Sequence, residues 1–499
     1  MTKVLFVTSE FYPLIKTGGL ADVSSSLPAA LSHLGLDIIP VLPGYPAVME
    51  GLQAPKQLKV FTPAETPYAT TLYEACVAPS GQKIWVVDTP ELFNRDGGPY
   101  VDSNKQDWPD NCRRFGHFCD IVSRLSLGQC GLSWVPDLVH GNDWQGGLVF
   151  AHLHHYANLH PQKKRPATLI TIHNIAYQGL FSYAEFEALS LPHEWWASGG
   201  VEFHGHFSFL KAGINYADVI TTVSPHYAQE ILSPEQGYGF EGLLNHRKEH
   251  LIGILNGADY AQWNPKTDAY IPHQYGPTSL QQKNLNKVAL QQSTGLASNK
   301  KLPLIGIVSR LAYQKGMDFL RTMIERFIED DVQWVVLGSG DPHIEQELLA
   351  LSRLHPEKCQ VRIGYDENMA HHIEAAADIF FMPSRYEPCG LNQIYSLKYG
   401  TIPVTTKTGG LADTIIDADD ANLAAGTATG FLADNDHIDV LEMRLRQALL
   451  AFQNKPLWLK LRRTAMAQDF SWNNSARQYL SAYNQAQTLN QKKALEFSS

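Results

Sequence analysis

Lys16-Thr17-Gly18-Gly19-Leu20-Ala21-Asp22 is repeated without a change at residues 407–413. Each copy follows an apolar run that is typical of a β-strand, at residues 4–7 and 402–406. Glycines let backbone N–H groups approach an anion closely, and the N-terminus of a following helix adds partial positive charge. The repeat therefore predicts two similar domains that bind one phosphorylated ligand. The competing interpretation is that each Gly-Gly pair only forms a turn, and the motif is not a Walker A loop.

Length and composition indicate a globular protein with more than one domain. The chain has 499 residues, of which 44% are hydrophobic and 18% charged. A net charge of -10 argues against nucleic acid as a partner, because a protein surface that binds nucleic acid needs a basic field. The six cysteines form no Cys-x-x-Cys pair, so we expect neither disulfides nor a metal site. No signal peptide or membrane-spanning run is evident, so we expect a cytoplasmic protein without membrane contact.

Strand-like apolar runs alternate with helix-length amphipathic runs, which is typical of parallel α/β sheets. The pattern restarts at residues 304–308, and the polar stretch 270–301 is expected to form surface excursions. We therefore predict an α/β fold with two doubly wound, Rossmann-like domains that face each other across a cleft. Ligands of such sheets bind at the carboxyl ends of strands.

Two loops of the second half carry groups suited to a diphosphate and a sugar. Arg310 and Lys315 follow the strand-like run 304–308, where a planar fork and a point charge can converge on one diphosphate. The alternative is a solvated pair of surface charges. Glu387 lies between the apolar run 379–382 and a predicted helix, where its carboxylate can bind sugar hydroxyls, stabilise positive charge or only cap the helix.

The residues after Glu387 add backbone groups to this loop. The N–H groups of Gly390 and Leu391 are expected at the helix N-terminus, facing phosphate oxygens. Cys389 is either a partly exposed thiol or a small packing residue.

In the first half, polar residues again follow strand-like runs. His173 ends the run 169–173, and Asp143 lies between the run 138–140 and a predicted helix. Each has a plain structural alternative, because a lone histidine is more often structural and an aspartate at this position can cap a helix. The histidine-rich stretch 152–155 lacks metal-ligand spacing beside a carboxylate, so we predict no metal site.

Together these motifs resemble those of the glycogen and starch synthase family. The resemblance covers nearly the whole chain except its polar C-terminal tail, and it rests on residues 16–23, 95–100, 216–231, 255–257, 308–316, 387–395 and 408–413. It implies a GT-B fold and transfer of glucose from ADP-glucose to the non-reducing end of an α-1,4-glucan such as glycogen. It also implies retention of configuration, release of ADP, and no metal or other cofactor.

The resemblance further implies roles for individual residues. Lys16 matches the family's ADP-glucose-binding lysine, and Arg310 with Lys315 matches the pair that neutralises the diphosphate. Glu387 matches the acidic residue beside the transferred glucose, and His173 matches the histidine near its 6-hydroxyl. The remaining expected binding residues are Gly18, Gly19, Asp143, Asn256, Tyr365 (on adenine), Cys389, Gly390, Leu391, Thr408, Gly409 and Gly410.

The same resemblance implies domains at residues 1–257 for the glucan acceptor and 258–475 for ADP-glucose. Residues 476–499 are expected to cross back to the first domain as a helix with a polar tail.

Some positions depart from the expected pattern. The wider retaining GT-B group often has a second glutamate where this chain has Tyr395, and Gln145 and Ala258 replace the family's usual residues. Two other functions stay open at this point. One is that the chain is a GT-B transferase that uses UDP-glucose. The other is that it is an inactive protein that binds glucan or a nucleotide sugar.

Overall fold

A mixed β-sheet forms the centre of the N-terminal part of the chain in this computed structural model, which describes residues 1–62, 64–78 and 80–496. The strand order is β12-β11-β7-β6-β1-β2-β5-β4-β3, parallel as far as β5 and antiparallel in β4 and β3. Its strands are β1 (Lys3–Val7), β2 (Asp37–Pro43), β3 (Gln53–Phe61), β4 (Thr70–Val77), β5 (Gln82–Asp88), β6 (Leu138–Asn142), β7 (Ala167–Ile172), β11 (Val219–Thr222) and β12 (Leu251–Gly253).

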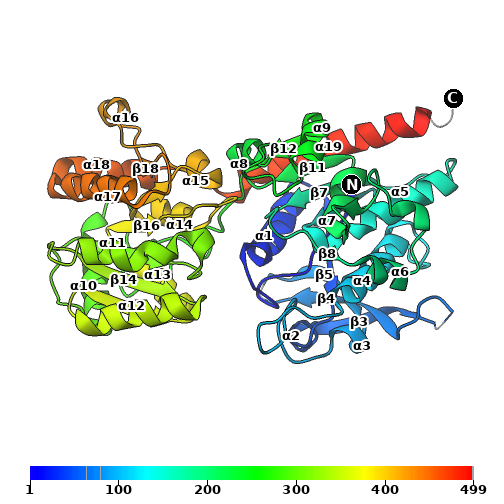
Figure 1. Cartoon of the computed structure of the whole chain (residues 1–499), viewed down its shortest axis with the longest axis horizontal. Helices are drawn as coiled ribbons and strands as arrows, with labels where there is room; N and C mark the ends of the chain where they lie inside the picture. The colour runs from blue at the N-terminus through cyan, green and yellow to red at the C-terminus, as the bar shows by residue number, and fades with distance from the viewer. Residues whose placement is uncertain (63, 79, 497–499) are drawn as a thin grey trace. The chain divides into compact units, whose positions relative to one another are not determined.

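Helices and a small second sheet surround this sheet (Figure 1). The helices are α1 (Gly19–His33), α2 (Pro46–Gly51), α3 (Pro90–Phe93), α4 (Asn111–Ser126), α5 (Leu148–Leu159), α6 (Tyr183–Ala188), α7 (Phe209–Tyr216), α8 (Pro225–Glu230), α9 (Glu241–His246) and α19 (Trp472–Glu496). The small sheet has the order β8 (Leu180–Phe181), β10 (His206–Ser208), β9 (Glu202–Phe203).

The second part of the chain folds around a parallel sheet with the order β15-β14-β13-β16-β17-β18. Its strands are β13 (Leu304–Val308), β14 (Gln333–Gly338), β15 (Cys359–Ile363), β16 (Ile379–Met382), β17 (Ile402–Thr406) and β18 (Phe431–Ala433). Its helices are α10 (Lys283–Thr294), α11 (Leu320–Arg326), α12 (Pro342–Leu354), α13 (Glu367–Ala376), α14 (Asn392–Tyr399), α15 (Gly409–Thr414), α16 (Asp420–Ala425), α17 (Ile438–Gln453) and α18 (Lys455–Met466).

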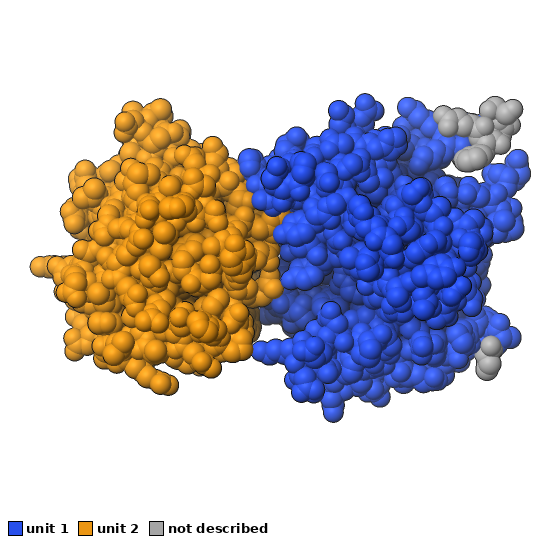
Figure 2. Space-filling model, in the orientation of Figure 1, with its two compact units in different colours: residues 1–257, 472–499 blue, residues 258–471 orange. Residues whose placement is uncertain are grey.

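The two parts are compact units, which we call unit 1 (residues 1–257 and 472–499) and unit 2 (258–471) (Figure 2). The final helix α19 belongs to unit 1, where Trp472, Tyr479 and Tyr483 are buried in one cluster with residues of β1 and α1. It begins at Trp472, so the expected boundary at 475 lies inside α19. The shift has a physical cause: a Cβ on Gly257 would lie 2.7 Å from the Cα of Trp472, which ties the start of α19 to unit 1.

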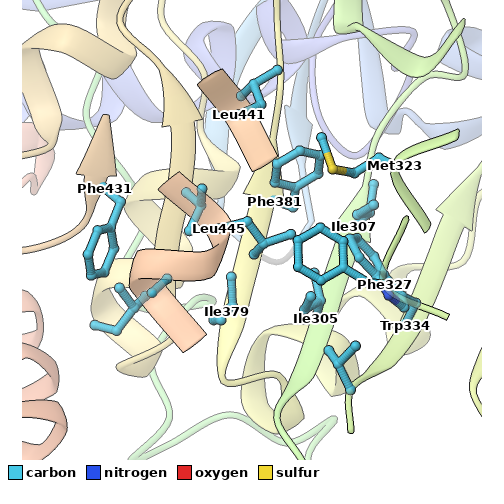
Figure 3. Packing of buried hydrophobic residues seen from close by; sticks show 14 of the residues in the cluster. Ile305, Ile307, Met323, Phe327, Trp334, Ile379, Phe381, Phe431, Leu441 and Leu445 are labelled. Carbon is cyan, nitrogen blue, oxygen red and sulfur yellow. The ribbon is translucent and has the colours of Figure 1, made fainter. Parts of the chain in front are cut away.

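Apolar side chains fill one face of the unit 2 sheet (Figure 3). Ile305 and Ile307 of β13 and Phe381 of β16 pack in one buried cluster with Leu441 and Leu445 of α17. The strand residues of this cluster alternate along the strands, as expected for a sheet face that packs against helices. Among the described residues, no helix is both long and apolar enough to cross a bilayer.

Helix α1 shows how the local sequence sets an element. Leu20, Val23, Leu27 and Leu31 recur at helical spacing and are buried. The helix ends at His33, and Gly35, with a φ of 88° that glycine adopts readily, follows it.

The polar stretch 270–301 differs from the expected surface excursions, because it contains α10. The helix is hard to predict because most of the residues that it buries are polar. Lys283 donates to the carbonyl of Glu374 at 2.8 Å, and Lys287 forms a 2.5 Å ion pair with Asp378. Paired charges can be buried, so polarity here does not indicate exposure.

Candidate functional site

The parallel part of each unit's large sheet has a point at which the strand order changes direction. In unit 1 this point lies between β1 and β6, and in unit 2 between β13 and β16. Ligands of doubly wound sheets bind at such switch points, outside the carboxyl ends of the strands. The loops after β1, β6 and β7 carry Lys16, Asp143 and His173, while the loops after β13 and β16 carry Arg310 and Glu387.

Lys315 and Glu387 form an ion pair at the unit 2 switch point. Lys315 Nζ lies 2.5 Å from Glu387 Oε2, and Ser384 Oγ donates to the same oxygen at 3.0 Å. Glu387 is only 7% exposed, and these two partners satisfy the hydrogen-bonding capacity of its Oε2. The structure thus brings together two residues that the sequence pattern assigned to separate tasks.

A second cation, Arg385, connects the loop after β16, in which it lies, to the loop after β13. It forms an ion pair with Asp318 at 2.5 Å and lies 3.9 Å from the centre of the Tyr313 ring. Its backbone N–H donates to the carbonyl of Gln314 at 3.0 Å. Arg310, in contrast, is exposed, and one of its Nη atoms donates to Gln314 Oε1 at 3.4 Å. Arg385 is therefore structural, and Arg310 is accessible to a ligand.

The residues after Glu387 lead into α14. Gly390 has a φ of 71°, and a Cβ there would lie 2.4 Å from Gln393 Oε1, so the turn requires glycine. Gly390 and Leu391 directly precede the helix, which places their N–H groups at its N-terminus as expected. Cys389 is buried, which favours the packing interpretation over a partly exposed thiol.

The second copy of the repeat packs directly on the Glu387 loop. A Cβ on Gly409 would lie 2.0 Å from the carbonyl oxygen of Glu387, and one on Gly410 would lie 2.1 Å from that of Cys389. The Gly410 N–H donates to the carbonyls of Glu387 and Pro388, both at 3.1 Å. The Gly410 N–H thus has acceptors within the protein, and phosphate binding by Thr408, Gly409 and Gly410 stays a prediction.

In unit 1, Asp143 and His173 lie side by side at the ends of β6 and β7. Asp143 Oδ1 accepts the backbone N–H of His173 at 2.7 Å, and His173 Nε2 lies 2.9 Å from Asn142 Oδ1. Burial raises the pKa of Asp143 to about 7 and lowers that of His173 to about 3. Asp143 also has a φ of 52°, which is strained for a residue other than glycine. A perturbed carboxyl and backbone strain at one position are typical of functional sites.

The first copy of the repeat is bound by an internal carboxylate, that of Glu10. Glu10 Oε2 accepts the N–H groups of Thr17 at 2.6 Å and Gly18 at 3.2 Å. The Gly18 N–H thus has an acceptor within the protein, and substrate binding by Gly18 stays a prediction. Lys16, in the same loop, forms a 2.9 Å ion pair with Asp22 and is partly exposed.

Comparisons with known proteins now decide the family. The chain matches the family model described as starch synthase catalytic domain over residues 3–246, and that described as glycosyl transferases group 1 over residues 290–455. It is 48% identical over 483 residues to the glycogen synthase of Thioalkalivibrio sulfidiphilus, which is 96% of this chain and 99% of that one. The chain belongs to the glycogen and starch synthase family. It is 46% identical to the glycogen synthase of Nitrosospira multiformis over 98% of each chain.

A solved structure of this family confirms the predicted fold. The catalytic domain of starch synthase IV from Arabidopsis thaliana, bound to ADP and acarbose, matches with a TM-score of 0.87 and 31% identity. The match covers 98% of this chain and 99% of that one. The fold is therefore GT-B, and the chain is a glycosyltransferase, as the family's two models also indicate.

Tyr395, where the wider GT-B group often has glutamate, has a packing role in this member of the glycogen and starch synthase family. Its ring stacks on Trp263, with centroids 4.1 Å apart and planes at 3°. The other face of Trp263 stacks on His371 at 3.7 Å. Tyr365 is 69% exposed, with its hydroxyl bound to Glu367, so its ring is accessible for the predicted stacking on adenine.

The remaining expected residues of this family's site are Asn256 and Gly19. Asn256 is 6% exposed, and its Oδ1 has no hydrogen-bond partner among the described residues, which fits a polar ligand contact. Gly19 is the first residue of α1. In the described part of the chain, no group of three or more His, Cys, Asp or Glu side chains is arranged to hold a metal ion.

The sequence pattern missed Glu10 as a site residue. Its contacts come from residues 17, 18 and 100, and no single motif contains all of them. The available signal is an acidic residue three positions after a central strand, in the loop that leads to the repeat.

Proposed function

We propose that the chain transfers glucose from ADP-glucose to the non-reducing end of an α-1,4-glucan, with retention of configuration and release of ADP. Membership of the glycogen and starch synthase family supports this, and the observation that carries the mechanism is the partly buried Lys315–Glu387 pair. Both groups follow strands that meet at the unit 2 switch point.

Breaking the sugar–phosphate bond builds negative charge on the leaving diphosphate and positive charge on the sugar ring. Arg310 and Lys315 are the unit 2 cations that we assign to the diphosphate, and the N-terminus of α14 adds N–H donors. Glu387 faces the ring as a carboxylate whose position Lys315 and Ser384 already fix. Such preorganised groups each contribute roughly 3–4 kcal/mol to transition-state stabilisation.

We assign the acceptor side to unit 1, with His173, Asp143 and Asn256 as polar contacts and Lys16 as a further donor contact. The proton of the acceptor hydroxyl passes to the leaving phosphate on the same face of the ring, so no second carboxylate is required. We further propose that the reaction needs no metal or other cofactor, because lysine and arginine side chains supply the positive charge. Its compartment is the cytoplasm, where the six free thiols stay reduced.

A donor assay tests this function. The full chain is incubated with glycogen and either ADP-glucose or UDP-glucose, with and without EDTA, and release of nucleoside diphosphate is measured. We expect release from ADP-glucose that EDTA does not reduce. A strong preference for UDP-glucose would overturn the donor, and loss of activity with EDTA would overturn the metal-free reaction. No release from either donor would favour an inactive binding protein.

A further inference from the structure

Glu10 is a buried carboxylate that holds an exposed loop. It is 3% exposed, whereas Thr17 and Gly18, which it contacts, are exposed. In addition to the two backbone N–H groups, Glu10 Oε1 accepts the hydroxyls of Thr17 at 2.5 Å and Tyr100 at 2.7 Å. Both carboxylate oxygens therefore have two donors each. Hydrogen bonds to a charged acceptor are about twice as strong as those between neutral groups.

Glu10 is connected both to the central sheet and to a helix of unit 1. Glu10 lies three residues after β1, the central strand of unit 1. The Tyr100 hydroxyl also lies 2.7 Å from Ser9 Oγ, and the Tyr100 carbonyl accepts Asn111 Nδ2 at 2.9 Å. The loop that carries Lys16 is thus connected through one carboxylate to the sheet and to α4.

We propose that Glu10 is a positioning residue for Lys16, which rests on the proposed role of Lys16 as a contact to ADP-glucose. By binding the N–H groups of the two residues that follow Lys16, the Glu10 carboxylate fixes the backbone from which the lysine side chain leaves. In the first repeat, the N–H groups of Thr17 and Gly18 therefore point inward to Glu10, and the side chain of Lys16 points outward. In the second repeat, the inward contact is made by the Gly410 N–H, and its acceptors are the backbone carbonyls of Glu387 and Pro388.

Steady-state kinetics on the full chain test this proposal. We expect Glu10→Ala to raise the apparent KM for ADP-glucose about tenfold while kcat changes less than about threefold, since binding geometry and not the chemical step is disturbed. Glu10→Gln keeps an oxygen for the two N–H groups, and its amide can donate to the two hydroxyls. We therefore expect its KM to stay within about threefold of that of the unaltered chain.

A double-mutant cycle separates positioning from general damage. If Glu10 acts through Lys16, Glu10→Ala adds less than about twofold to the KM of Lys16→Gln, because the two changes share one interaction. Asp37→Asn is the matched control, since Asp37 is a unit 1 carboxylate that accepts Trp134 Nε1 at 2.7 Å, away from this loop. We expect that control to leave the KM unchanged.

Three results would overturn the proposal. They are an unchanged KM in a folded Glu10→Ala protein, a Glu10→Gln protein as defective as Glu10→Ala, and multiplicative effects of Glu10→Ala and Lys16→Gln. Thermal unfolding of each variant shows whether it is folded, and Glu10→Gln keeps the test decisive if Glu10→Ala is not. If the unaltered chain does not use ADP-glucose at all, the proposed function fails instead, and the donor assay reveals this first.

Discussion

Glu387 and Lys315 each neutralise the other in a nearly buried place, and the reaction that we propose uses both. Glu387→Ala removes the carboxylate next to the ring while Arg310 and Lys315 stay available for the diphosphate. We expect kcat to fall at least about 100-fold, because the loss of one preorganised electrostatic contact has that size of effect. ADP binding, measured by calorimetry, is expected to stay within about threefold. Near-normal turnover would remove Glu387 from the mechanism.

The raised pKa of Asp143 predicts how the stability of the folded chain depends on pH. Its pKa is raised to about 7 in the folded chain, so the folded state keeps a proton that the unfolded state loses above about pH 4. The contribution of this carboxyl to the free energy of unfolding is therefore fully present at low pH and is lost as pH rises through 7. Asp143→Asn has no such ionisation, and its Oδ1 can still accept the N–H of His173.

The measurement is thermal unfolding of both proteins at pH 5 and pH 8. We expect the unfolding temperature of Asp143→Asn, relative to the unaltered chain, to be higher at pH 8 than at pH 5. The lowered pKa of His173 acts in the opposite direction, with stability gained as pH rises, but it is common to both proteins. A difference that does not change with pH would show that Asp143 ionises normally.

At the scale of elements, the two copies of the repeat offer a matched pair of substitutions. Gly18 and Gly409 occupy the same position in the repeat, yet a Cβ on Gly18 meets nothing within 4 Å and one on Gly409 lies 2.0 Å from the Glu387 carbonyl. Gly409 also has a φ of 43°, which disfavours alanine.

We expect Gly409→Ala to lower the free energy of unfolding by about 2–3 kcal/mol and to reduce kcat, because the Glu387 loop must move. Gly18→Ala is expected to change activity less than about threefold, since its N–H can still donate to Glu10. Denaturant unfolding and turnover of both variants provide the comparison. Equal effects of the two substitutions would contradict the different packing of the two loops.

The same repeat shows how far the sequence can predict the site. Apolar runs followed by polar loops predicted the sheets and placed Asp143, His173, Arg310 and Glu387 at strand ends. The sequence could not show that the glycine N–H groups bind protein oxygens, because the acceptors, Glu10 and the 387–388 carbonyls, lie in other loops. It also missed β3, whose residues are mostly exposed and include Pro55, as suits an edge strand.

At the scale of the whole molecule, unit 1 is made of two separate segments and unit 2 of one. All residues of the two buried clusters of unit 2 come from residues 258–471. The unit 1 cluster that contains Trp472, Tyr479 and Tyr483 depends on the last segment of the chain, and the Tyr483 hydroxyl lies 2.8 Å from His140 Nδ1 on β6. The two units therefore differ in whether they can fold from one continuous piece.

We expect residues 258–471 alone to fold and to bind ADP within about tenfold of the full chain, without transferring glucose. A chain that ends at Ser471 loses α19, and removing one large buried side chain already costs about 3–5 kcal/mol. Because the whole stability of a domain is about 5–15 kcal/mol, unit 1 of that truncated chain is expected not to fold. Circular dichroism and hydrogen exchange on both fragments provide the measurement. A truncated chain with a protected β1 and β7 would show that α19 only covers a sheet that is stable without it.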